Sequence, residues 1–116
     1  MARTLALLAH PTQVDALLDW LSKHQGVLTH FQIMAPLDIA QAIEQGWNVK
    51  TIELVTLKDS IQGGDIELAA HILAGSVAGV IFFSDPGAIA TAFPSFALVL
   101  RACQIHGTPI ALNDIS

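Results

Sequence analysis

The sequence predicts an α/β fold, with one doubly wound sheet of five parallel strands and helices on both faces. Three observations lead to this fold class. Short, continuously apolar runs are typical of strands that are buried on both faces of a parallel sheet. Segments with apolar residues at helical spacing lie between these runs, and Gly or Pro closes most segments. The alternation continues through all 116 residues without a linker or a repeat, so we expect one domain, 1–116.

The first strand and the first helix are predicted directly at the start of the chain. Residues 4–9 form an apolar run that ends at a His-Pro pair, which is typical of a buried strand. From Thr12 onward the apolar residues follow helical spacing. Thr12 and Asp15 form a candidate cap, and Gly26 stands just beyond the expected end.

The second and third strands flank the second helix. Residues 31–35 predict a short strand, after which Pro36 and Asp38 introduce a helix that runs through Gln45. Residues 49–55 predict the third strand.

The second half of the chain continues the same alternation. Residues 57–64 predict a polar loop that ends in two glycines, and the helix after it is closed by Gly75. The run "AGVIFF", residues 78–83, predicts the fourth strand. Residues 96–105 predict the last helix, and residues 109–112 the fifth strand.

Composition excludes several classes of partner. Hydrophobic residues make up 53% of the chain and charged residues 13%, and we expect part of this apolar excess at subunit contacts. The 10 acidic and 5 basic residues give a formal net charge of −5, and the basic residues form no patch. We therefore expect no nucleic-acid partner and no membrane partner.

The single cysteine and the absence of cofactor motifs indicate the cellular compartment and the cofactors to expect. Cys103 lies in an apolar helical context, so we predict a buried small side chain in a reducing, cytoplasmic protein. No apolar stretch approaches the roughly 18 residues that span a bilayer, and the short N-terminal apolar run predicts a strand rather than a signal peptide. No glycine motif of the dinucleotide or Walker type is present, and the histidines lack metal-ligand spacing. We predict no cofactor and no metal.

Ligands of open parallel sheets bind outside the carboxyl ends of the strands, where helix N-termini and backbone donors converge. Most polar residues that adjoin the predicted strands fall on this edge. They are His10, Asp38, Lys58, Asp59, Ser60, Asp65, Ser84, Asp85 and Asn113, together with Gly63 and Gly64.

These residue types allow two interpretations. A histidine, two aspartates and a glycine-rich turn provide a candidate general base, a group that orients it and an oxyanion site. Alternatively, Asp65 caps its helix by accepting the Leu68 amide, Asp85 starts a turn before a proline, and His10 only bonds the end of a strand.

The segments "LALLAH", "QGGD", "VIFFSDP", "LRAC" and "TPIALN" together resemble the methylglyoxal synthase family over nearly the whole chain. The resemblance implies a five-stranded α/β fold, a homohexamer, and elimination of phosphate from dihydroxyacetone phosphate to give methylglyoxal. It also implies that Asp65 is the catalytic base, that His10 contacts the substrate and that Asp85 supports the site.

This sequence departs from the family around the phosphate. The family's Thr-Gly-Thr-Thr-Gly clamp after the second strand is replaced by "PLDIA", residues 36–40. Pro36 has no amide hydrogen, and Asp38 brings an anion, which repels a nearby phosphate by about 4 kcal/mol per charge pair at close range. Further polar positions of the family are changed to Pro11, Val14, Ala92 and Ser95, and its Ser-Gly-Pro turn reads Asp59-Ser60-Ile61.

We therefore hold two functional hypotheses. The first is a divergent, catalytically weak or inactive family member that acts as a ligand-binding, regulatory or assembly module in a homo-oligomer, with a phosphorylated or carboxylated metabolite as one candidate ligand. The second is an active synthase in which Lys58 and Ser60 replace the phosphate clamp. The candidate substrate-binding residues are Gly63, Gly64, Lys58, Ser60 and Asn113.

Overall fold

The computed structural model describes residues 3–46, 52–87 and 92–112. Its five strands form one sheet in the order β3-β2-β1-β4-β5, and every described pair of neighbours is parallel. The strands are β1 (Arg3–Ala9), β2 (Phe31–Pro36), β3 (Glu53–Leu57), β4 (Gly79–Phe83) and β5 (Ile110–Leu112). The predicted fold class is confirmed.

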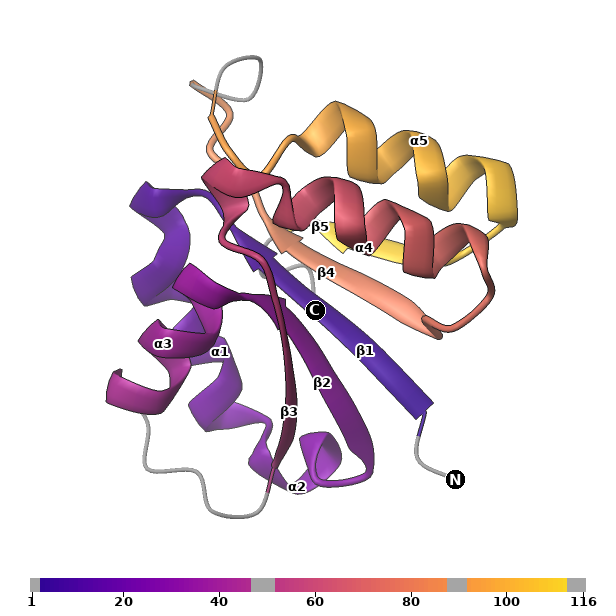
Figure 1. Ribbon diagram of the computed structural model, residues 1–116. Coiled ribbons are helices and arrows are strands. Elements are labelled where there is room, and N and C mark those ends of the chain that lie inside the picture. Colours follow the sequence, from indigo (N-terminus) through magenta and orange to yellow (C-terminus); the bar gives the residue numbers. More distant parts are fainter. Residues whose placement is uncertain (1–2, 47–51, 88–91, 113–116) are drawn as a thin grey trace.

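Helices cover both faces of the sheet, as Figure 1 shows. On one face lie α1 (Val14–Lys23), α2 (Gln25–Leu28) and α3 (Leu37–Gly46), and on the other lie α4 (Gly64–Leu73) and α5 (Phe96–His106) side by side. Two single-turn 3-10 helices, η1 (Pro11–Gln13) and η2 (Ser60–Gln62), follow strands β1 and β3.

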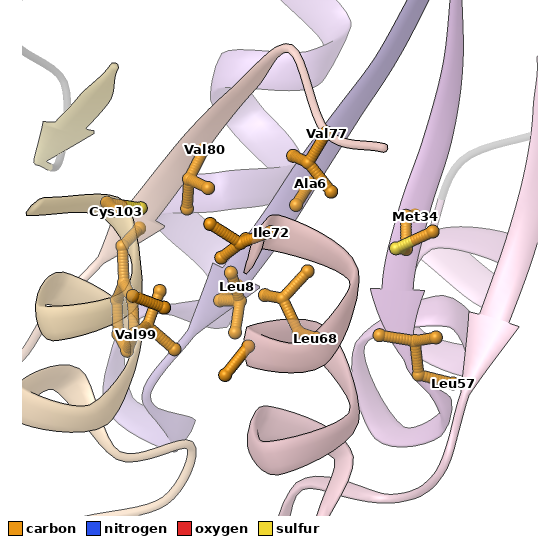
Figure 2. Close-up of a cluster of buried hydrophobic side chains, with 13 residues drawn as sticks. Ala6, Leu8, Met34, Leu57, Leu68, Ile72, Val77, Val80, Val99 and Cys103 are labelled. Carbon is orange, nitrogen blue, oxygen red and sulfur yellow. The ribbon is translucent and has the colours of Figure 1, made fainter. Parts of the chain in front are cut away.

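The alternation of side chains along β1 divides the interior into two cores. Leu7 and Ala9 pack with α1, α2 and α3, whereas Ala6 and Leu8 pack with α4 and α5. Figure 2 shows the second core, where Leu8 and Val80 of the sheet face Leu68, Ile72, Val99 and Cys103 of the two helices. A strand buried on both faces requires a continuously apolar sequence, which is why β1 could be predicted.

Three predicted details are wrong. The third strand spans Glu53–Leu57 rather than residues 49–55, of which 49–51 lie outside the described residues. Gly26 does not terminate a helix but lies inside α2, because α1 already ends at Lys23, with His24 as its C-cap, and a short second helix follows. The Thr12/Asp15 cap does not form, since the N-cap of α1 is Gln13 and no side chain bonds it.

Within residues 3–46, 52–87 and 92–112, no helix has the length and apolar character needed to cross a membrane.

Candidate functional site

Strand register brings the predicted site residues to one edge of the sheet. Ala9 pairs with Phe83, so His10 and Ser84 follow neighbouring strands, and Pro36 pairs with Leu57. The order β3-β2-β1-β4-β5 reverses direction between β1 and β4, and this is the place where doubly wound folds bind ligands.

His10 lies at this switch point and is completely buried, with 0% of its surface exposed. Its Nδ1 accepts a hydrogen bond of 2.8 Å from the backbone amide of Asp85. Because Nδ1 accepts, the ring proton is on Nε2, which donates to the carbonyl oxygen of Pro94 at 3.0 Å. The ring also meets Phe82 edge-on, with 5.1 Å between centroids. The orientation of the His10 ring is therefore fixed by both of its nitrogens, and Nε2 donates toward the segment before α5.

Asp85 starts the turn after β4 and is held by two donors. Its Oδ2 accepts from the Thr12 hydroxyl at 2.7 Å, and its Oδ1 accepts from the Gly87 amide at 2.9 Å. The Thr12 hydroxyl and then the Gly87 amide hold the pKa of Asp85 below its usual range. The prediction that Asp85 starts a turn agrees with this geometry.

Asp65 does not cap its helix, so that interpretation is wrong. The N-cap of α4 is Gly63, and Asp65 lies inside the first turn. Its Oδ1 accepts from the Ile66 amide at 2.9 Å and its Oδ2 from the Ser95 amide at 2.7 Å, rather than from Leu68. Only 3% of Asp65 is exposed. The side chain turns toward the segment before α5, because an amide there offers a strong donor to a buried carboxylate.

One peptide group joins His10 to Asp65. The Pro94 carbonyl accepts from His10 Nε2, and the Ser95 amide of the same peptide unit donates to Asp65 Oδ2. The Ser95 hydroxyl accepts from the Leu98 amide at 3.3 Å and so caps α5. The two predicted catalytic side chains are thus assembled, and both are bonded to a neutral peptide of the chain itself.

The glycine pair before α4 meets two backbone requirements. Gly63 has a φ of 97°, in the left-handed region that favours glycine. Gly64 is fully helical, but a Cβ there would overlap the carbonyl oxygen of Lys58. These two glycines allow the loop after β3 to pass directly against the start of α4.

The other half of the edge is organised around Asp38, in the first turn of α3. Its Oδ1 accepts from both the amide of Ser60, at 3.0 Å, and the Ser60 hydroxyl, at 2.8 Å. Ser60 is 2% exposed. The exposed Lys58 lies two residues earlier, and its backbone amide donates to Glu67 Oε1 at 2.8 Å. Both donors of Ser60 are therefore directed at a carboxylate of the protein itself.

The structure places several of the predicted residues that it describes in two hydrogen-bonded networks. His10, Asp65 and Asp85 belong to one hydrogen-bonded network, and Ser60 with Asp38 forms a second. Asn113 lies outside the described residues.

Sequence reasoning missed two groups of this network. Thr12 bonds Asp85 instead of capping α1, and its position two residues after His10 is the available signal. The Pro94–Ser95 peptide acts through backbone atoms, which carry no signal in the sequence.

Two further features concern residues 3–46, 52–87 and 92–112. No group of three or more His, Cys, Asp or Glu side chains there is arranged to hold a metal ion. Cys103 is buried, as predicted, and burial raises the pKa of its thiol.

Several known proteins that resemble this chain are methylglyoxal synthases. The chain is 32% identical over 111 residues to the methylglyoxal synthase of Coxiella burnetii, covering 96% of this chain and 76% of that protein. It is 28% identical over 113 residues to an uncharacterized protein of Synechocystis, of which it spans 25%. No family model matches the chain.

The structural comparison agrees. The crystal structure of methylglyoxal synthase from Elizabethkingia anophelis superposes with a TM-score of 0.87 at 29% identity, covering 97% of this chain and 72% of that one. The identity to the Coxiella protein extends over most of both chains, and the fold is the same. The chain therefore belongs to the methylglyoxal synthase family.

Proposed function

We propose that this chain is a catalytically weak or inactive member of its family and acts as a small-ligand-binding, regulatory or assembly module. One observation carries the proposal: the Pro94–Ser95 peptide occupies both His10 Nε2 and Asp65 Oδ2. Neither side chain is more than 3% exposed. A substrate can reach the base only if this peptide moves away, which lowers the fraction of molecules able to react.

The phosphate end of the site supports the same proposal. Elimination of phosphate requires donors that stabilise the departing anion, and the loss of one preorganised donor commonly costs about 10²–10³ in rate. Here Pro36 has no amide hydrogen, and Asp38 takes both donors of Ser60. The carboxylate of Asp38 also opposes a second anion beside it.

Ligand binding is tested by thermal shift. The purified protein is screened against phosphates, carboxylates and uncharged carbonyl compounds, since a ligand that binds only the folded state raises its melting temperature. We expect at least one small molecule to raise it, with the effect reduced in His10→Gln. A flat response to all classes would remove ligand binding from the proposal and leave assembly alone.

The alternative function is an active methylglyoxal synthase that converts dihydroxyacetone phosphate to methylglyoxal and phosphate. It is favoured by the assembly of Asp65, His10 and Asp85 in one network. The exposed Lys58 would supply the cation for the phosphate, and Asp65 would act as general base. Turnover that disappears in Asp65→Asn but persists in Asp59→Asn would establish this alternative.

We further propose a homo-oligomer, with the family's hexamer as the expected size, in the cytoplasm. Four exposed large apolar side chains are next in sequence to residues of the two hydrogen-bonded networks and support a subunit contact there. They are Leu37, Ile61, Ile66 and Phe93. Light scattering at micromolar concentration tests assembly, and a monomer would contradict it. We also propose a small-molecule ligand at the candidate site. We propose no nucleic-acid or membrane partner, because the net charge is −5 and the basic residues form no patch.

A further inference from the structure

We propose that Asp38 is a specificity-determining residue that makes the candidate site reject phosphate and other anionic groups, so that its ligand is an uncharged carbonyl or hydroxyl compound. The inference rests on the proposed ligand-binding function and names the class of ligand.

The first step is the bonding of Asp38 itself. A backbone amide and a hydroxyl that converge on one point are a typical partner for an anion. Ser60 presents both, and the Asp38 Oδ1 atom receives both, at 3.0 Å and 2.8 Å. Ser60 is buried, so solvent does not compete for these donors. A ligand phosphate would have to displace a carboxylate that is tethered to the same chain.

The second step is the charge around Asp38. The neighbouring carboxylates are held in place by backbone amides, since Asp59 Oδ1 accepts from the Ile61 amide and Glu67 Oε1 from the Lys58 amide. Asp65 lies in the same first turn of α4 as Glu67. The described residues of this loop and of the first turns of α3 and α4 include one cation, Lys58, and four carboxylates, Asp38, Asp59, Asp65 and Glu67. An approaching anion is therefore repelled by a negative electrostatic potential.

The third step concerns what the site does accept. His10 donates through Nε2 and Asp65 accepts through Oδ2, and between them they hold a neutral peptide group. Nδ1 of His10 carries no proton, so the ring brings no positive charge to attract an anion. A carbonyl oxygen with a nearby N–H or O–H group satisfies both partners without any charge, which defines the ligand class.

The test compares affinities for inorganic phosphate and for uncharged dihydroxyacetone by isothermal titration calorimetry. Wild type is measured beside Asp38→Ala, which frees the Ser60 donors, and Asp38→Asn, which removes the charge but keeps the oxygen that Ser60 bonds. Glu44→Gln is the matched control, because Glu44 is an exposed residue of the same helix and the charge change is equal. Melting temperatures verify that each variant is folded.

We expect Asp38→Ala to bind phosphate at least about tenfold more tightly than wild type, with a smaller gain in Asp38→Asn and none in Glu44→Gln. Affinity for dihydroxyacetone should be the same in all four proteins. Equal phosphate affinity in wild type and both Asp38 variants would overturn the inference. If Asp38→Ala does not fold, the comparison of Asp38→Asn with wild type tests the inference by itself. Failure of the proposed function gives a different result, namely release of phosphate from dihydroxyacetone phosphate by the wild type.

Discussion

Replacing Asp65 by asparagine tests how this buried carboxylate is used in the folded protein. Each of its two oxygens accepts a separate backbone amide, from Ile66 at 2.9 Å and from Ser95 at 2.7 Å. Asparagine offers only one oxygen, so its NH₂ group must face one of these amides. One partly buried N–H then loses its acceptor, whichever way the side-chain amide is turned.

The expected loss of stability follows from that count. A buried donor left without a partner costs about 1–3 kcal/mol, more where the lost acceptor was charged. For a domain of this size, each kcal/mol lowers the melting temperature by about 4 °C. We therefore expect Asp65→Asn to unfold about 4–12 °C below wild type.

The assays are thermal and urea denaturation followed by circular dichroism, with Asp59→Asn as the control. Asp59 accepts one amide through one oxygen, from Ile61 at 3.0 Å, and asparagine keeps that bond. The control removes the same charge, and its unfolding free energy should stay within about 0.5 kcal/mol of wild type. If the two variants were equally stable, the assignment of both Asp65 oxygens to backbone amides would be refuted.

Three further predictions follow from the same structure. Gly64→Ala should lower the unfolding free energy by about 1–3 kcal/mol, because the added Cβ would overlap the carbonyl oxygen of Lys58. Gly26→Ala is the control in the same denaturation assay: its Cβ meets nothing within 4 Å, so the variant should be as stable as wild type or more stable. Because the pKa of Asp85 is lowered in the folded protein, its carboxylate stabilises the fold above its unfolded pKa, and this stabilisation is lost as the pH falls through its folded pKa. Thr12→Val should raise the folded pKa of Asp85 in a carboxyl NMR titration, and an unchanged titration midpoint of Asp85 would contradict the hydrogen bond from Thr12. Nitrogen NMR of His10 should show a protonated Nε2 and an unprotonated Nδ1, and the reverse tautomer would disagree with both of its bonds.

The sheet and its helices could be predicted because their signals are local. A strand such as β1 needs a continuously apolar run, and a helix such as α4 shows its stripe within a few turns. The third strand was placed too early because an apolar run does not show where pairing begins. Its position is set by its pairing with β2, in which Leu57 stands opposite Pro36.

The residues of the candidate site could be predicted from the sequence, but their hydrogen-bond partners could not. His10, Asp65 and Asp85 could be found because each follows a strand or a glycine turn. Their partners could not, since the bonds of His10 to Pro94 and of Asp85 to Thr12 join residues 84 and 73 positions apart. The helix-cap interpretation of Asp65 failed for the same reason, because a distant amide at Ser95 competes with the local one.

The central proposal is that Asp65 stands at the position of a catalytic base in a site that performs the family's elimination weakly or not at all. The most direct measurement is a single-turnover experiment, with wild type in molar excess over dihydroxyacetone phosphate and phosphate release followed over time. Excess protein reveals even one slow turnover per site. The account predicts that release by wild type is slow and close to the background rate measured with Asp65→Asn. Fast release by wild type that Asp65→Asn abolishes would contradict it.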